Sequence, residues 1–259
     1  MSTSYTLRID CALLRYYHAQ DHIKILYDHI KQAEKLENYQ IVDAENNGDK
    51  KIIKFKNNPP VLLSLVLGDV IHSLRSSLDY IACAIVSFCN SGADLAHIQF
   101  PFGEKGKALN CKNRSCIKGV SDAALDLIES IREKHSEGLS LICNFSNQDK
   151  HRLLLPAYTH CIGYKFQVDE KKETTTMLSV QPQRVLDHKT LIKDGDTIDF
   201  SDQLMKAIRI GFQLENDDGY YGTESIYLMN DTVRQVLNSI IPFFSIAMLE
   251  SETDSKKSA

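Results

Sequence analysis

The segment Leu62–Phe88 constrains the fold of this chain more than any other segment. Its large apolar residues repeat at helical spacing and fall within about 50° of one direction on a helix that turns 100° per residue. These residues are Leu67, Val70, Ile71, Leu74, Leu78, Ile81 and Ile85. A continuous apolar stripe on so long a helix predicts a core element, around which an N-terminal helical bundle is built.

The other side of this helix is polar. It carries Asp69, His72, Arg75, Ser76, Asp79 and Cys83, a set that we call the polar seam. The seam has neither Lys nor Glu, and its short or planar groups suit fixed hydrogen bonds. His72, Arg75 and Asp79 lie along one ridge of the helix. A solvated face, a buried structural network and a functional site are all compatible with this pattern.

The residues around this helix predict further elements before Pro156. Asn46-Asn47-Gly48-Asp49 predicts a hairpin turn, because Asn-Gly accepts the positive φ angles that a tight turn needs. Ser121 is the expected N-cap of one helix. The predicted elements are a helix over Thr6–Glu37, hairpin strands at Tyr39–Asp43 and Lys51–Phe55, and helices at Ala123–His135 and Leu139–Asn147.

After Pro156 the pattern changes to short β-branched or alternating runs, which favour strands. These runs are Tyr164–Val168, Met177–Gln181, Thr190–Ile192, Thr197–Phe200 and Ile208–Leu214. A final apolar helix is expected over Ser225–Leu249. The predicted class is therefore α+β: a helical bundle over 1–158 with an inserted hairpin at 39–55, a small antiparallel sheet with a C-terminal helix packing back on the bundle over 159–250, and a disordered tail over 251–259.

Composition narrows the functional classes. The chain has 259 residues, 43% of them hydrophobic, and a formal net charge of −4, so no global positive charge favours nucleic acid or an anionic membrane. Seven cysteines, an odd number, suit a reducing compartment, and a cytoplasmic protein with neither membrane span nor cofactor is expected. Cys111 and Cys116 are not joined by a second ligand pair, so no metal site is expected.

A second polar group lies between two apolar segments. Asn144-Phe145-Ser146-Asn147-Gln148-Asp149-Lys150-His151-Arg152 is rich in amides, carboxylates and cations, and Leu153–Pro156 follows it directly. A turn with a helix cap explains the Asn and Asp residues. A group that binds or transfers protons is the alternative, because the segment lies between two stretches expected to be buried.

Three motifs in this order, GDVIHSLRSSLDYIA, QFPF and NQDKHRLLL, resemble a widespread bacterial family of unknown function over about Val61–Pro156. The arrangement in turn resembles the HEPN superfamily of helical bundles. That resemblance implies a metal-independent endoribonuclease or RNA-binding component of a toxin or phage-defence system, acting as a homodimer. Many members of that superfamily carry a paired Arg and His, and the resemblance implies that Asn147-x3-His151 takes the place of this pair here.

Two hypotheses for the site follow. In the first, the polar seam faces the segment Asn144–Arg152, which we call the late motif, and together they bind and cleave a phosphodiester of RNA. Cleavage by a 2′-hydroxyl needs a group that titrates near neutrality and a cation that stabilises the developing charge. The catalytic candidates are His151, Asn147, Arg75 and His72, and the binding candidates are Asp79, Asp149, Lys150 and Arg152. In the second, the protein is a non-enzymatic binding or structural protein, and Arg75, Asp79, Asp149 and Arg152 form a buried lock.

Overall fold

The computed structural model describes residues 4–35, 39–44, 47–55, 59–102, 107–151, 155, 157–165, 190–192, 197–199, 204–212, 214 and 221–257. Its helices are α1 (Ser4–Lys35), α2 (Val61–Cys89), α3 (Cys111–Ser115), α4 (Asp122–Lys134), α5 (Ser136–His151) and α7 (Thr223–Lys257). Its strands are β1 (Tyr39–Ala44), β2 (Asn47–Phe55), β3 (Ala157–Lys165), β4 (Thr190–Ile192), β5 (Thr197–Asp199) and β6 (Leu204–Phe212). Among the predicted strands, Met177–Gln181 lies outside the described residues.

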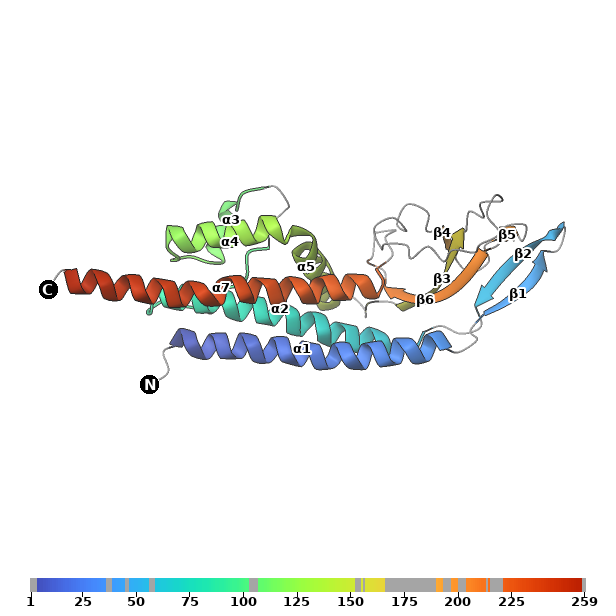
Figure 1. The fold of residues 1–259 in the computed structure, drawn as a ribbon, viewed down its shortest axis with the longest axis horizontal. Helices are drawn as coiled ribbons and strands as arrows, with labels where there is room; N and C mark the ends of the chain where they lie inside the picture. The colour runs from blue at the N-terminus through green and yellow to red at the C-terminus, as the bar shows by residue number, and fades with distance from the viewer. Residues whose placement is uncertain are drawn as a thin grey trace, which may run out of the picture.

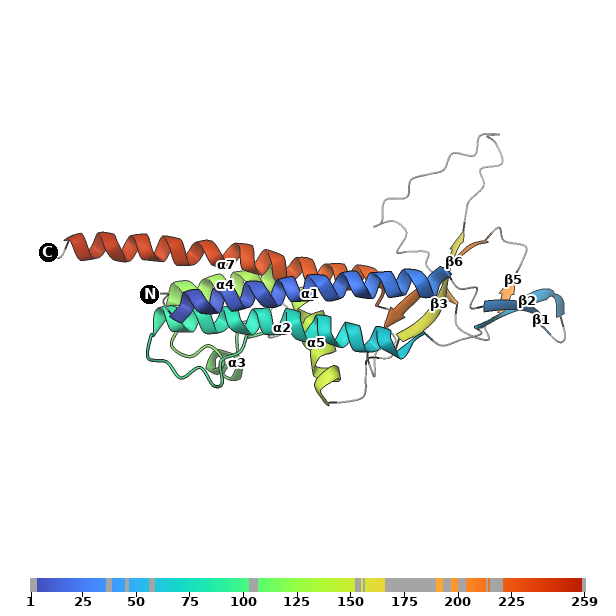
Figure 2. The same cartoon turned by 90° about the horizontal axis from the view of Figure 1, so that it is seen from below.

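Three long helices form the body of the molecule. α1, α2 and α7 lie side by side along the long axis, and α1 runs opposite to the other two (Figures 1 and 2). α5 packs against α2 and α7, while α4 contacts α5 and α7 (Figure 1). α7 continues as a helix through residues 251–257, which the sequence pattern had assigned to a polar tail.

The apolar stripe of α2 forms the centre of this bundle. All seven residues predicted for it are fully buried, which confirms the expected core helix. By length and composition alone α2 could cross a bilayer, but most of its apolar window is covered by the rest of the chain, as in the core helix of a globular bundle. A helix that is buried on most of its surface is apolar whether the protein interior or lipid surrounds it.

One end of the bundle is closed by four aromatic rings. Tyr5 of α1 contacts Phe88 of α2 at 5.1 Å between ring centroids and Phe244 of α7 at 5.5 Å. Phe88 also lies edge-on to Phe244 and Phe243. Edge-to-face and offset-stacked rings add to the stabilisation from their buried area, so this cluster joins the N-terminus of α1 to the end of α2 and the middle of α7.

The strands lie beyond the opposite end of the bundle (Figure 1). They pair in two separate three-stranded antiparallel sheets, with strand orders β1-β2-β5 and β4-β3-β6. In the first sheet, Tyr39 is opposite Phe55. In the second, β3 pairs with β6 along its whole length.

The predicted α+β class is wrong. The helical bundle and the loops that join its helices hold the core, and this part of the chain is 78% helical with no strand or sheet. The two small sheets lie outside it, so the protein is classed as a helical bundle. The short β-branched runs indicated locally extended backbone. A fold class depends instead on which elements bury the core, and here nearly all the buried apolar side chains of the described residues come from helices and the loops that join them.

The start of α4 provides a first testable prediction. The Ser121 hydroxyl accepts a hydrogen bond from the Ala124 backbone N–H at 3.3 Å, which confirms the predicted N-cap. Ser121→Ala is expected to lower the free energy of unfolding by about 1 kcal/mol, because a backbone donor loses its acceptor. Chemical denaturation measures this loss. Ser140→Ala, at an exposed position on α5, is the control; an equal loss in both variants would contradict the capping role.

Candidate functional site

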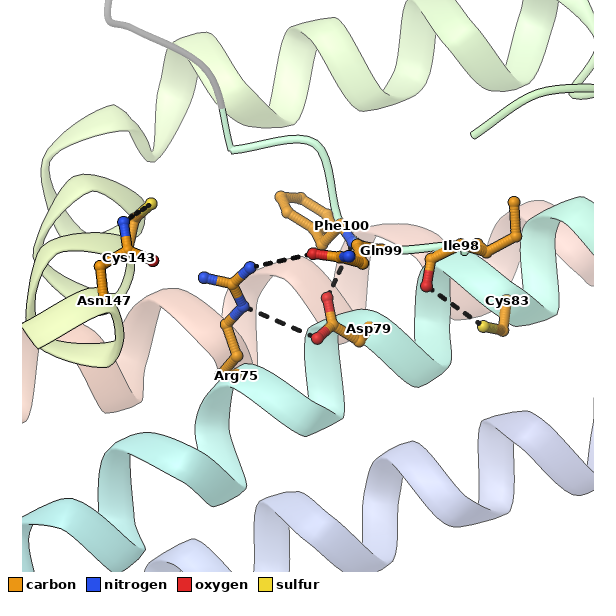
Figure 3. A network of polar contacts seen from close by, with 8 residues as sticks. All are labelled: Arg75, Asp79, Cys83, Ile98, Gln99, Phe100, Cys143 and Asn147. Carbon is orange, nitrogen blue, oxygen red and sulfur yellow. Dashed lines mark hydrogen bonds and ion pairs between the residues drawn. The ribbon is translucent and has the colours of Figure 1, made fainter. Parts of the chain in front are cut away.

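The polar seam carries an ion pair in the middle of α2. Nε of Arg75 lies 3.6 Å from Oδ2 of Asp79, one helical turn further along (Figure 3). The Arg75 side chain is 10% exposed and that of Asp79 28% exposed. The Nη2 donor of Arg75 also reaches Oε1 of Gln99 at 3.4 Å. The guanidinium is thus engaged by groups of this chain on two sides.

The same two residues fasten the segment Ile98–Phe102 to α2. Oδ1 of Asp79 accepts a hydrogen bond from the Phe100 backbone N–H at 2.9 Å (Figure 3). One turn further along, the Cys83 thiol donates to the Ile98 carbonyl at 4.0 Å. Burial raises the pKa of Cys83 and keeps it a protonated donor, an effect that the charge of Arg8 partly opposes. The segment therefore lies along the seam as a strap.

The Arg75 guanidinium also lies against an aromatic ring of the strap. Its Cζ is 4.4 Å from the centroid of the Phe102 ring, a cation–π contact. Arg75 as a whole is only 8% exposed, and its Nη1 is buried without a hydrogen-bond partner among the described residues. The carboxylate of Asp79, the amide of Gln99 and the ring of Phe102 together stabilise this enclosed cation. Burying a charge is unfavourable unless such groups compensate for the lost water.

A second buried arginine holds the other end of the strap. Arg132 of α4, 6% exposed, donates from Nε to the Phe102 carbonyl at 3.0 Å and from Nη2 to the Lys107 carbonyl at 3.3 Å. Burial lowers the pKa of Arg132, although Glu129 opposes the shift. Arg132 thus binds two backbone carbonyls of the strap and the loop after it, and three residues further along, burial lowers the pKa of His135.

The late motif lies on α5, next to the first turns of α2. Gly68 packs so closely against Asp149 that a Cβ there would lie 3.0 Å from Asp149 Oδ1. Asn147 is exposed and donates to Cys143 Sγ at 3.6 Å (Figure 3). Lys150 and His151 are the last residues of α5; their side chains, and Arg152 altogether, lie outside the described residues.

The structure divides the seam into two parts. Arg75 and Asp79 meet each other and the strap, whereas Asp69 and His72 are exposed on the preceding turns. Asp149 lies at Gly68, seven residues before Arg75, which is about 10 Å along a helix. The predicted site residues thus separate into a buried pair, an exposed pair and a carboxylate near the start of α2. The assignment of catalytic and binding roles to them stays a prediction.

Gln99 and Arg132 belong to the network but were not among the residues selected from the sequence. Both carry a signal that could have identified them. The motif QFPF joins an amide to two aromatic residues on either side of a proline, and Arg132 interrupts the apolar pattern of an amphipathic helix. An arginine at a buried position needs acceptors, and the carbonyls of a nearby loop supply them.

Within the described ranges no group of three or more His, Cys, Asp or Glu side chains is arranged to hold a metal ion. No family model, curated protein or solved structure matches the chain. The resemblance to HEPN bundles therefore stays a prediction from the three motifs, and the geometry of the seam is the main basis for a functional proposal.

Proposed function

We propose that this protein is a non-enzymatic binding or structural protein, in which Arg75 and Asp79 act as a lock that fastens the strap Ile98–Phe102 to the core helix. One observation carries the proposal: the Arg75 guanidinium is almost fully buried and is engaged by Asp79, Gln99 and Phe102 of its own chain. A cation that neutralises a phosphorane must face the substrate. This one faces the strap.

The endoribonuclease predicted from the HEPN resemblance is the competing function. It needs Arg75 or a neighbouring cation to reach RNA together with His151. The burial of Arg75 supports the lock instead, and the exposed His72 lies on the preceding turn rather than beside the guanidinium. A homodimer, an RNA partner and a role in toxin or phage-defence systems rest on the same resemblance.

The lock predicts a specific pattern of stabilities. Arg75→Met keeps much of the side-chain length but removes the guanidinium from the Arg75–Asp79 ion pair. We expect a loss of about 2 kcal/mol in the free energy of unfolding, below the value for a fully buried pair because Asp79 is partly exposed. Asp79→Asn retains an acceptor for the Phe100 N–H. The double variant removes both charges, so its loss should be about 1 kcal/mol smaller than the sum of the two single losses.

The exposed pair Arg234 and Asp231 of α7 provides the matched control. These side chains are 54% and 51% exposed and are three residues apart, so Arg234→Met and Asp231→Asn should each change stability by less than about 0.5 kcal/mol. Urea denaturation of the wild type and the five variants gives the comparison. If Arg75→Met costs no more than Arg234→Met, the lock is excluded.

An RNA assay separates the two functions. Purified protein is incubated with unstructured RNA, and products are compared with those of His151→Ala and Arg75→Met. The lock predicts that cleavage stays at the background of a buffer control for all three proteins. Cleavage by the wild type that is lost in His151→Ala, with unchanged circular dichroism, would establish the nuclease instead.

A further inference from the structure

Two histidines of α1 lie one turn apart and point their outer ring nitrogens at each other. His18 and His22 are four residues apart, a spacing that places both side chains on one face of a helix. Their Nε2 atoms are 3.3 Å apart and their ring centroids 4.4 Å apart. His18 is exposed and His22 is partly buried, with 23% of its side chain accessible, so solvent reaches the pair.

The neighbouring helix places an oxygen near the inner nitrogen of each ring. Nδ1 of His18 is 3.1 Å from the Ser73 hydroxyl of α2. Nδ1 of His22 is 3.8 Å from Oδ2 of Asp69, also on α2, and is itself buried without a hydrogen-bond partner. Asp69 and Ser73 are one turn apart on α2, as the two histidines are on α1. Two adjacent helical turns thus present matched pairs of side chains.

This arrangement meets three requirements of a transition-metal site. Zinc binds imidazole nitrogen at 2.0–2.1 Å, so two nitrogens at a tetrahedral angle are about 3.4 Å apart, close to the separation of the two Nε2 atoms. Imidazole is a preferred ligand of zinc, nickel and copper. A metal-bound histidine usually donates its other N–H to a carboxylate or another acceptor, which fixes the tautomer; Asp69 and the Ser73 oxygen are placed for that role.

We propose that His18 and His22 form a two-histidine binding site for a divalent transition-metal ion such as Zn²⁺, with both Nε2 atoms as ligands and water in the remaining positions. Asp69 and Ser73 are positioning residues, since they touch the rings rather than the ion. The site has two protein ligands. It is therefore compatible with the finding that no group of three or more His, Cys, Asp or Glu among the described residues is arranged to hold a metal ion. It does not depend on the lock of Arg75 and Asp79.

A hydrogen bond between the two rings is the alternative explanation of the short Nε2 separation. One neutral imidazole then donates from Nε2 and the other accepts, and only one of the two Nδ1 atoms of the pair carries a proton. The two explanations differ in what a metal ion does. Replacing either ring weakens Zn²⁺ binding at a metal site, whereas a pair joined only by an internal hydrogen bond does not bind Zn²⁺ even in the wild-type protein.

The test is isothermal titration calorimetry of the full chain, purified without a histidine tag, with ZnCl₂. We expect one ion per chain for the wild type. His18→Ala and His22→Ala should each weaken binding by about tenfold or more, and Asp69→Asn by about tenfold, in the range typical of residues that orient a metal-bound imidazole. His97→Ala, in the exposed loop after α2, should bind as the wild type does.

A second readout separates a lost site from a misfolded variant. Zn²⁺ should raise the Tm of the wild type and of His97→Ala, because an ion that binds only the folded state stabilises it, and it should leave the Tm of His22→Ala unchanged. Circular dichroism without metal reports whether each variant is folded. The proposal is overturned if the wild type shows no saturable Zn²⁺ binding, or if folded His18→Ala and His22→Ala bind as tightly as His97→Ala.

Discussion

Phe145→Ala is expected to lower the free energy of unfolding by about 4 kcal/mol, the largest effect among the substitutions considered. Phe145 is 1% exposed in α5 and meets the Tyr221 ring edge-on at 5.2 Å between centroids. Truncation removes buried apolar surface and leaves a cavity between α5 and the start of α7, where close-packed helices relax only in part. Denaturant unfolding followed by circular dichroism measures the loss.

The adjacent residue is the control for this prediction. Asn144 is exposed on the same helix, so Asn144→Ala should change stability by no more than about 0.5 kcal/mol. Phe145→Leu, which fills part of the cavity, should lie between the two. A loss below about 1 kcal/mol for Phe145→Ala would show that α5 is not packed as the structure places it.

Gly138→Ala should cost about 3 kcal/mol, although alanine is the better helix former. A Cβ on Gly138 would lie 2.0 Å from Oγ1 and 2.8 Å from Cβ of Thr232, which is buried in α7. The propensity gain of about 1 kcal/mol cannot offset a contact that forces α5 and α7 apart. Thermal and urea unfolding should both show the loss.

A second substitution tests the cause. Thr232→Ala removes the two outer atoms that the new Cβ would meet and leaves only the Thr232 Cβ contact, so it should recover part of the stability of Gly138→Ala. Gly92 supplies the control, because a Cβ there meets only Asn90 Oδ1 at 3.8 Å and Gly92→Ala should be nearly neutral. No recovery in the double variant would mean that Gly138 matters for another reason than its contact with α7.

The close contact at Gly138 shows what a sequence pattern leaves open. The sequence pattern placed Gly138 between two predicted helices, Ala123–His135 and Leu139–Asn147, and gave it no other role. In the structure Gly138 lies inside α5, which begins at Ser136, and its missing side chain makes room for Thr232. Nothing in the sequence pairs residues 94 positions apart; only the packing of α5 on α7 does.

The polar seam is a second example. Helical periodicity placed Asp69, His72, Arg75 and Asp79 on one side of a helix, and that placement needs no knowledge of neighbours. Whether such a side is solvated, buried or functional depends on what covers it. The strap Ile98–Phe102 covers Arg75 and leaves His72 exposed, so the seam is both a buried network and a solvated face.

The spacing His18-x3-His22 is visible in the sequence, but neither histidine is among the site residues predicted from it. Two histidines one turn apart are common on solvated helix faces, so the spacing alone carries little weight. What adds weight is the second helix, because Ser73 and Asp69 lie against the inner nitrogens.

By itself the sequence determined the core helix Leu62–Phe88, because an apolar stripe at helical spacing has one way to be buried whatever packs against it. It also determined the cap at Ser121, because a cap is made within four consecutive residues. Tertiary structure decided the fold class, the burial of Arg75 and the meeting of α1 with α2 at the histidine pair. These depend on contacts between residues distant in the chain, and local propensity and periodicity carry no information about which distant side chains meet.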